Sequence, residues 1–212
     1  MSNKQRIQWY RSPLAADDLA RLNQRSDWQG WVQSVGHLAI LMLTGSLAWL
    51  AVGRLHWIIV LALIFLHGTV YAFLVNGFHE LCHKTVFQTR SLNIIFRNIY
   101  AFLGWYNHVS FWASHQEHHK HTLHPPDDLE VVLPVNLTLK SYLGFAFINP
   151  MGFYRRLKGV IQLCFGIIEG EWENALFPPD AIEKRRELFN WARVLLVGHS
   201  LIVIVSLALG LW

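Results

Sequence analysis

The sequence predicts an all-α integral membrane protein. We expect a transmembrane helical hairpin, a third transmembrane helix, interfacial helices and cytoplasmic helices that carry histidines. The 212-residue chain is 53% hydrophobic and only 15% charged, whereas soluble domains carry about 25% charged residues. Three apolar stretches are long enough to cross a bilayer as helices. Eight of the twelve histidines fall between residues 79 and 124.

The predicted spans are residues 35–53, 57–78 and 194–212. Only three residues, 54–56, separate the first two spans, so they are expected to form a tight helical hairpin. A long polar segment precedes the first span. A secretory signal peptide would have its apolar stretch much nearer the N-terminus, so none is expected.

Basic residues predict the orientation of these spans. Five lie before the first span, one in the hairpin turn, twelve in the central segment 79–193 and none after the third span. Lys and Arg are retained on the cytoplasmic side of membranes. We therefore expect a multi-pass protein whose N-terminus and central segment face the cytoplasm.

The central segment contains two apolar stretches, residues 91–112 and 137–168, that Arg, Asn, Pro and Gly interrupt. Aromatic-rich helices with scattered basic residues commonly lie at the membrane surface; a further pair of crossings is the alternative. The net charge of +4 comes without a basic run interleaved with polar or aromatic residues, so nucleic-acid binding is not expected. Two cysteines without framework spacing predict no disulfide scaffold.

Two histidine clusters point to a metal site. His79 and His83 are four residues apart, and His115, His118 and His119 are spaced i, i+3, i+4, so each cluster lies on one helical face. Neutral imidazole suits Zn, Cu, Fe and Ni rather than Mg or Ca. A single zinc takes about three or four protein ligands. Five clustered imidazoles therefore suggest two metal ions.

The isolated histidines are expected to have other roles. His37 and His56 are predicted to be surface or interfacial residues. His67 and His199 lie inside predicted spans, where a hydrogen-bonded structural role is expected, although ionisable groups within a membrane are often functional.

Several residues beside the clusters have open roles. His108, His121 and His124 could each contact a metal, support a ligand or be structural; His121 lies off the shared face and His124 precedes two prolines. Glu80 and Glu117 could orient imidazoles through hydrogen bonds or form solvated salt bridges.

Residues 79–83 read HELCH, which also fits the H-E-x-x-H template of zinc proteases. Glu80 would then be the general base on a zinc-bound water. Such an enzyme needs a third ligand, but the third span has no carboxylate and Asp127 and Asp128 lie in a Pro-rich stretch. The second cluster would have no role, so a protease is disfavoured.

A metal transporter is the non-enzymatic alternative. It would need polar groups along a path through the bilayer. Only His37, His67 and His199 lie within the spans, and no Asp or Glu does. This alternative is disfavoured too.

The clusters resemble the histidine boxes of integral-membrane fatty acid desaturases and related hydroxylases. HELCH matches the first box, H-x-x-x-H, directly after a membrane hairpin, and HQEHH (residues 115–119) matches the second, H-x-x-H-H. The following HTLHPPDDLE is similar to the continuation of that family. The resemblance implies that the first box (His79 and His83) and the second box (His115, His118 and His119) bind two iron ions.

The same resemblance implies the reaction and the partners. The iron pair would activate O2 to place a double bond in a fatty acyl chain of a membrane lipid, with electrons from a donor such as ferredoxin or cytochrome b5. An acyl chain can enter such a site sideways from the bilayer. Hydroxylation of an alkane, carotenoid or sphingolipid is the related alternative.

The family also has a third box after a second membrane hairpin, and this sequence has none. The resemblance extends over residues 1–212 as one desaturase-type membrane domain, but an incomplete one. Five boxed imidazoles underfill two irons, so weak metal binding and poor turnover are expected of the chain alone. A shorter protein with a different histidine site is the alternative.

Overall fold

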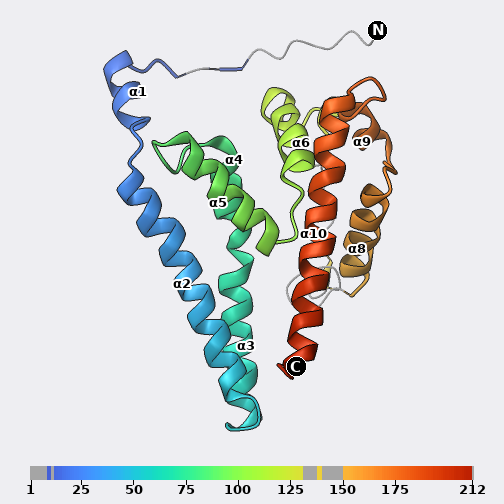
Figure 1. The fold of residues 1–212 in the computed structure, drawn as a ribbon. Coiled ribbons are helices and arrows are strands. Elements are labelled where there is room, and N and C mark those ends of the chain that lie inside the picture. Colours follow the sequence, from blue (N-terminus) through green and yellow to red (C-terminus); the bar gives the residue numbers. More distant parts are fainter. Residues whose placement is uncertain (1–8, 11, 131–137, 140–149, 212) are drawn as a thin grey trace. The chain divides into compact units, whose positions relative to one another are not determined.

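The computed structural model describes residues 9–10, 12–130, 138–139 and 150–211. The chain divides into a hairpin unit, Tyr10–Tyr106, and a C-terminal unit, Asn107–Trp212 with Met1–Trp9. Among the described residues every regular element is a helix, which confirms the all-α prediction (Figure 1). In the described part of the chain, three helical stretches are long and apolar enough to cross a membrane.

The hairpin unit begins with α1 (Ala16–Leu22) and the long helix α2 (Asp27–Ala51), which a short turn joins to α3 (Trp57–Ala72). Ser26 caps α2, because its side chain accepts a hydrogen bond from the Gln29 backbone N–H at 3.4 Å. The helix therefore starts at Asp27 rather than at residue 35, where the apolar run begins.

Small and polar side chains form much of the buried side of α2. The residues that α2 buries include Ser34, Thr44, Ala48 and Ala51. Small residues let membrane helices approach closely, where apolar lipid offers no hydrophobic drive for association. His67 of α3 crosses this interface, with Nδ1 3.0 Å from Thr44 Oγ1. The structural role predicted for His67 is confirmed.

The second predicted span is interrupted before the first box. α3 ends at Ala72, and α4 (Leu74–His83) begins after Phe73, whose N–H bonds to the carbonyl of Val70, three residues back. α3 buries no residue, whereas α4 buries Leu74, Phe78, Leu81 and Cys82. The helix that carries the first box is thus a packed element, distinct from the exposed apolar helix before it.

α5 (Arg90–Leu103) packs against α4. Thr89, which precedes α5, and Tyr100 within it both bond to the N-terminal part of α2. The Asp27 carboxylate accepts hydrogen bonds from the N–H and hydroxyl of Thr89 at 2.8 and 2.6 Å. Burial raises the pKa of Tyr100 to about 12, so its hydroxyl stays protonated and lies 3.0 Å from the Ser34 carbonyl oxygen.

His37 and His56 differ in their surroundings. His37 is half-buried, where its Nε2–H donates to the Val70 carbonyl at 3.0 Å and its Nδ1 lies 3.2 Å from the Tyr100 hydroxyl. It therefore links α2, α3 and α5, which its sequence neighbours did not indicate. His56 is exposed in the hairpin turn, as expected, and caps α3 through the N–H of Ile58.

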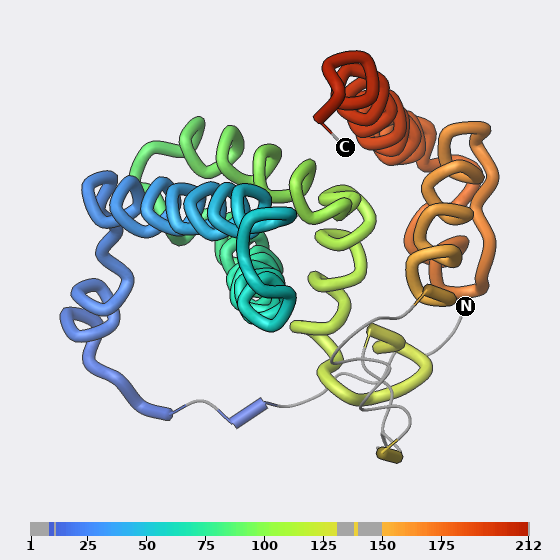
Figure 2. The backbone as a smooth tube through the Cα atoms, turned by 90° about the horizontal axis from the view of Figure 1, so that it is seen from below, coloured from blue at the N-terminus to red at the C-terminus, as the bar shows by residue number. Residues whose placement is uncertain are grey.

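The C-terminal unit contains α6 (His108–His121), α8 (Pro150–Cys164), α9 (Glu171–Leu176) and α10 (Ile182–Ala208). α8 lies alongside α10, as both Figure 1 and Figure 2 show. α10 begins at Ile182 rather than at residue 194, because the charged residues before the third predicted span are also helical. Residues 137 and 140–149 of the predicted surface segment lie outside the described residues.

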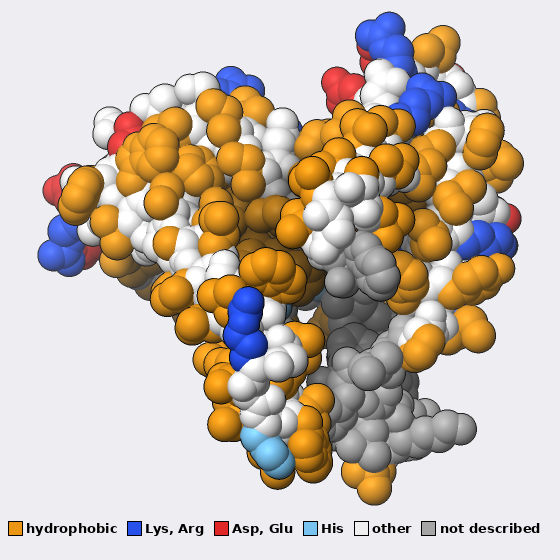
Figure 3. Space-filling model, turned by 60° about the horizontal axis from the view of Figure 1, so that its bottom comes forward, with side chains coloured by type: hydrophobic (Ala, Val, Ile, Leu, Met, Phe, Trp, Pro, Cys, Tyr) orange, Lys and Arg blue, Asp and Glu red, His pale blue; other side chains and the backbone are white. Residues whose placement is uncertain are grey.

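The helices expose many apolar side chains, which Figure 3 shows over much of the surface. Val197, Leu201 and Ile204 of α10 are 57%, 55% and 60% exposed. Exposed apolar surface on this scale suits lipid rather than water. His199, in the same helix, donates from Nδ1 to the Leu195 carbonyl at 2.9 Å, which confirms its predicted hydrogen-bonded role.

Candidate metal centre

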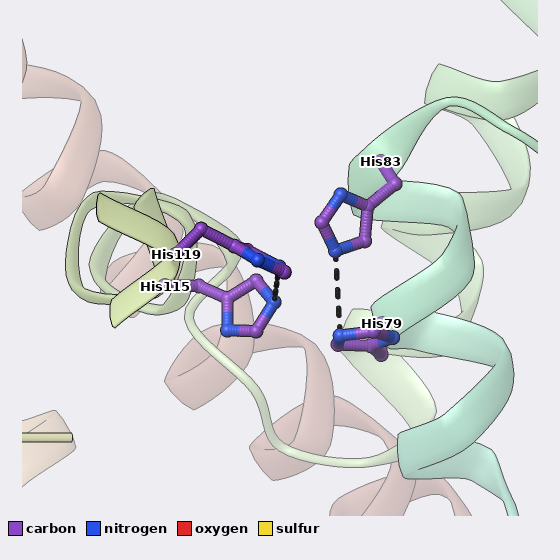
Figure 4. A group of neighbouring side chains, drawn as sticks. All are labelled: His79, His83, His115 and His119. Atoms are coloured by element: carbon purple, nitrogen blue, oxygen red, sulfur yellow. Dashed lines mark hydrogen bonds between the residues drawn. The ribbon is translucent and has the colours of Figure 1, made fainter. Parts of the chain in front are cut away.

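The first box forms an imidazole pair on one face of α4. His79 and His83 are one turn apart, and their Nε2 atoms lie 3.3 Å from each other (Figure 4). The ring centroids are 4.7 Å apart. The spacing of four residues in a helix produces this arrangement, so the sequence prediction of a shared face is confirmed for this pair.

Glu80 holds the other nitrogen of His79. Its Oε1 lies 3.0 Å from His79 Nδ1, and the Thr85 hydroxyl lies 3.0 Å from the Glu80 carbonyl and 3.3 Å from Oε2. A carboxylate on Nδ1 fixes the proton there and leaves Nε2 as the ligand nitrogen. Of the two roles expected for Glu80, the structure shows the orienting one.

α6, which carries the second box, is anchored at its start. The Asn107 side chain accepts hydrogen bonds from the N–H groups of Val109 and Ser110 at 3.1 and 3.3 Å. It also donates to the Leu188 carbonyl of α10 at 2.9 Å. One asparagine therefore both caps α6 and fixes it against α10.

The second box forms another imidazole pair. The Nε2 atoms of His115 and His119 lie 3.0 Å apart (Figure 4). The Phe111 ring stacks on His115 with centroids 4.9 Å apart, and His115 is only 5% exposed. Packing therefore restricts the orientation of this ligand.

Two carboxylates hold the outer nitrogens of the second box. Glu130 Oε1 lies 2.8 Å from His115 Nδ1, and Asp128 Oδ2 lies 2.8 Å from His118 Nδ1. Glu130 Oε2 is buried and has no hydrogen-bond partner. Each carboxylate thereby orients its imidazole and favours the tautomer protonated at Nδ1, the arrangement that carboxylate–histidine pairs adopt at metal sites.

Asp128 is fully buried at the base of this network. It accepts hydrogen bonds from the N–H groups of Leu123 at 2.7 Å and Glu130 at 2.9 Å, besides His118. Burial alone would raise the pKa of the Asp128 carboxyl, but these hydrogen bonds outweigh it and the pKa lies below its usual range. Asp128 is therefore an anion that faces His118.

The supporting roles of Asp128 and Glu130 are not predicted from the sequence, where Asp128 is a candidate third zinc ligand and Glu130 only part of the stretch that resembles the family. The available signal was two acidic residues shortly after the box, beyond Pro125 and Pro126. The sequence spacing alone does not predict the turn that brings Asp128 and Glu130 back against α6.

The remaining histidines of the region have structural contacts. The His108 ring lies 4.5 Å from the Trp191 ring of α10. His124 follows the turn at the end of α6, with Nδ1 2.8 Å from the His121 carbonyl. These contacts favour the structural alternative for both residues.

Glu117 contacts two residues in the last turn of α6. It forms an ion pair with Lys120 at 2.6 Å and lies 3.6 Å from His121 Nε2. His121 is buried, and its Nδ1 has no hydrogen-bond partner. The salt-bridge alternative therefore holds for Glu117.

The donor set fits a transition metal. His79, His83, His115 and His119 each offer a ring nitrogen that could bind a metal ion. Imidazole donors suit iron, zinc or copper, whereas Mg and Ca prefer oxygen. Among the described residues, Glu80, Asp128 and Glu130 bond to the outer nitrogens of the rings, so the donor set favours a transition metal over a hard cation.

Comparison with known families agrees with this chemistry. Residues 55–212, more than half of the chain, match the family described as fatty acid desaturase. No curated protein and no solved structure matches the chain. Since the matched region contains both histidine pairs and two of the three long apolar helical stretches, the chain belongs to the fatty acid desaturase family.

Proposed function

We propose that this protein is a membrane-bound di-iron oxidoreductase that introduces a double bond into a fatty acyl chain. O2 is the co-substrate, and a redox partner such as ferredoxin or cytochrome b5 supplies electrons. The observation that carries the proposal is common to both boxes. Each presents a pair of Nε2 atoms, with a carboxylate on the Nδ1 of at least one imidazole.

The proposed ligands are His79 and His83 from α4 and His115, His118 and His119 from α6. We propose that the two boxes converge on one iron pair. His118 belongs to the set because Asp128 holds its Nδ1, which leaves Nε2 for the metal. Bound iron supplies the oxidising power for O2-dependent removal of hydrogen from an unactivated C–H bond.

The chain's own residues then have three tasks. Glu80, Asp128 and Glu130 keep the rings in one tautomer and one orientation. Exposed apolar helices place the protein in the bilayer, from which an acyl chain can enter without crossing water. The basic residues before the hairpin and in the central segment support a cytoplasmic position for the N-terminus and both boxes, where a soluble electron donor would have access.

The position of Glu80 argues against proteolysis. A protease glutamate must reach a water on the metal, which binds at the Nε2 side of the histidines. Here Glu80 lies at the Nδ1 side of His79, and its second oxygen lies 3.3 Å from the Thr85 hydroxyl. These contacts suit a residue that orients a ligand.

Metal and lipid analysis of the same preparations tests the proposal. We expect the membrane-expressed chain to retain iron in preference to zinc, weakly, and to give a low yield of unsaturated acyl chains in the host lipids. His115→Ala should abolish both signals, because it removes a buried ligand. His56→Ala, a histidine exposed in the hairpin turn, should change neither.

Three results would count against the proposal. Retention of zinc without iron would support a hydrolytic site. A hydroxylated product in place of an unsaturated one would indicate that the protein is a hydroxylase rather than a desaturase. Iron retention that survives loss of both His79 and His115 would show that the boxes are not the ligands.

A further inference from the structure

A basic pocket lies at the start of α10, separate from the histidine boxes in sequence and composition. It has a volume of about 290 Å³, and its lining residues are Pro179, Ile182, Arg185, Arg186, Phe189 and Arg193. Three of these six residues are arginines, and none is acidic. We refer to these six residues as the arginine pocket.

Backbone contacts hold two of the guanidinium groups in place. Arg185 Nη1 donates to the Phe177 carbonyl at 3.0 Å, and its guanidinium carbon lies 5.6 Å from the Phe189 ring centroid. Arg193 Nε donates to the Cys164 carbonyl of α8 at 3.1 Å. A guanidinium has five N–H donors, so these bonds orient each group and still leave donors for a ligand.

Within the described part of the chain, Arg186 forms an exposed ion pair with Glu183, one turn earlier on α10. Exposed pairs of this kind contribute little to stability. An anion can therefore compete for Arg186 without a large cost to the fold.

Exposed apolar residues follow the arginine pocket along α10. Arg193, Val197 and Leu201 follow each other at intervals of four, so each lies one turn further along α10 and about 40° further around it. Val197 and Leu201 are 57% and 55% exposed. Leu201 lies about 12 Å beyond Arg193 along the helix axis. A ligand with an anionic head and an apolar tail would match this order of side chains.

We propose that the arginine pocket binds the phosphate group of an anionic phospholipid, with the acyl chains along Val197 and Leu201. Guanidinium groups recognise phosphate oxygens in a bidentate manner. Basic pockets between helices near the cytoplasmic membrane surface suit anionic head groups. None of the six lining residues is a histidine of the boxes, so lipid binding at this pocket is independent of the proposed iron chemistry.

Lipid binding by the purified full-length chain in a neutral detergent tests this assignment. Short-chain phosphatidylglycerol should raise the midpoint of thermal unfolding in a saturable way. Diacylglycerol has tails without phosphate, and glycerol phosphate has phosphate without tails; both should bind much more weakly. Equal affinity for glycerol phosphate would overturn the lipid assignment and identify a soluble phosphate ester as the ligand.

Single charge removals within α10 provide the matched comparison. Arg186→Gln should weaken phosphatidylglycerol binding about tenfold, since a hydrogen bond to a charged group is lost. Lys184→Gln removes the same charge two residues away but from outside the arginine pocket, and it should leave the affinity unchanged. Equal weakening by both variants would show that only the general charge of the helix matters, and the proposal would fall.

Arg193→Lys gives a second, charge-preserving comparison. It retains the positive charge but removes the planar fork that binds two phosphate oxygens. We expect weaker phosphatidylglycerol binding with an unchanged helical circular dichroism spectrum. Undiminished binding by both Arg186→Gln and Arg193→Lys would exclude the pocket.

Discussion

His118 and Asp128 form a hydrogen bond at the buried end of the second box, with Nδ1 2.8 Å from Oδ2. Asp128 has no exposed surface and is held by two backbone N–H groups as well. The turn after α6 is therefore built around this carboxylate. The orientation of His118 depends on a residue ten positions further along the chain.

Replacing Asp128 by Asn tests this dependence. The amide lacks the charge that stabilises the Nδ1–H tautomer of His118. We expect iron affinity to fall about 10- to 100-fold, the usual effect of losing a residue that supports a metal ligand. Competition with a chromogenic chelator measures the change. Asp127→Asn, which alters the neighbouring carboxylate, should leave the affinity within the error of wild type.

Glu130→Gln separates charge from hydrogen bonding at His115. The amide oxygen can still accept the Nδ1–H bond, but without charge. We expect iron affinity to fall about tenfold, and Glu130→Ala to cost more, up to about 100-fold. The same chelator competition applies, with Glu171→Gln on α9 as an exposed control. An unchanged affinity in Glu130→Ala would remove Glu130 from the site.

Tyr100→Phe tests the link between α5 and α2. The variant loses the hydroxyl that lies 3.0 Å from the Ser34 carbonyl and 3.2 Å from His37. The free energy of unfolding in detergent should drop by about 1 kcal/mol, the typical value of one hydrogen bond, or somewhat more because the partners stay buried. Tyr10→Phe, at a residue that is 87% exposed, should have no effect.

Two glycines of α2 form a matched pair for packing. A Cβ at Gly30 would lie 2.5 Å from Phe87 Cδ1, whereas a Cβ at Gly36 would meet nothing within 4 Å. Phe87 is fully buried and stacks on Phe96, with centroids 5.0 Å apart. Gly30→Ala should therefore destabilise the hairpin unit by about 1–3 kcal/mol.

Gly36→Ala should instead raise stability by about 0.5–1 kcal/mol, because alanine is the better helix former. Chemical unfolding of both variants, followed by circular dichroism, compares them directly. Similar stability for the two variants would contradict the close packing of Gly30 on Phe87.

The sequence predicts well the features that depend on residues close to one another in the chain. Hydropathy over about 20 residues located the three long apolar helices, and a spacing of four placed His79 with His83 and His115 with His119 on shared faces. The break at Phe73 was not predicted, because the apolar run continues across it into Leu74 and Val75. The early starts of α2 and α10 were missed because polar residues there extend a helix that hydropathy alone does not detect.

Such patterns do not predict contacts between residues that are far apart in the sequence. His37 looked like an isolated interfacial histidine, yet it bonds to Val70 and lies beside Tyr100. Glu130 approaches His115 only because the chain turns back after α6. Nothing in the local spacing determines such a return, since it results from tertiary packing.

The contrast between α3 and α4 has a consequence for the tolerance of the two helices to substitution. α3 buries no side chain, so one aliphatic residue there can replace another with little loss of stability, provided that it stays in contact with lipid. A few residues later, Leu74 and Phe78 are fully enclosed, and their shapes are constrained by neighbours. Sequence drift should therefore be fast along α3 and slow from Leu74 onward.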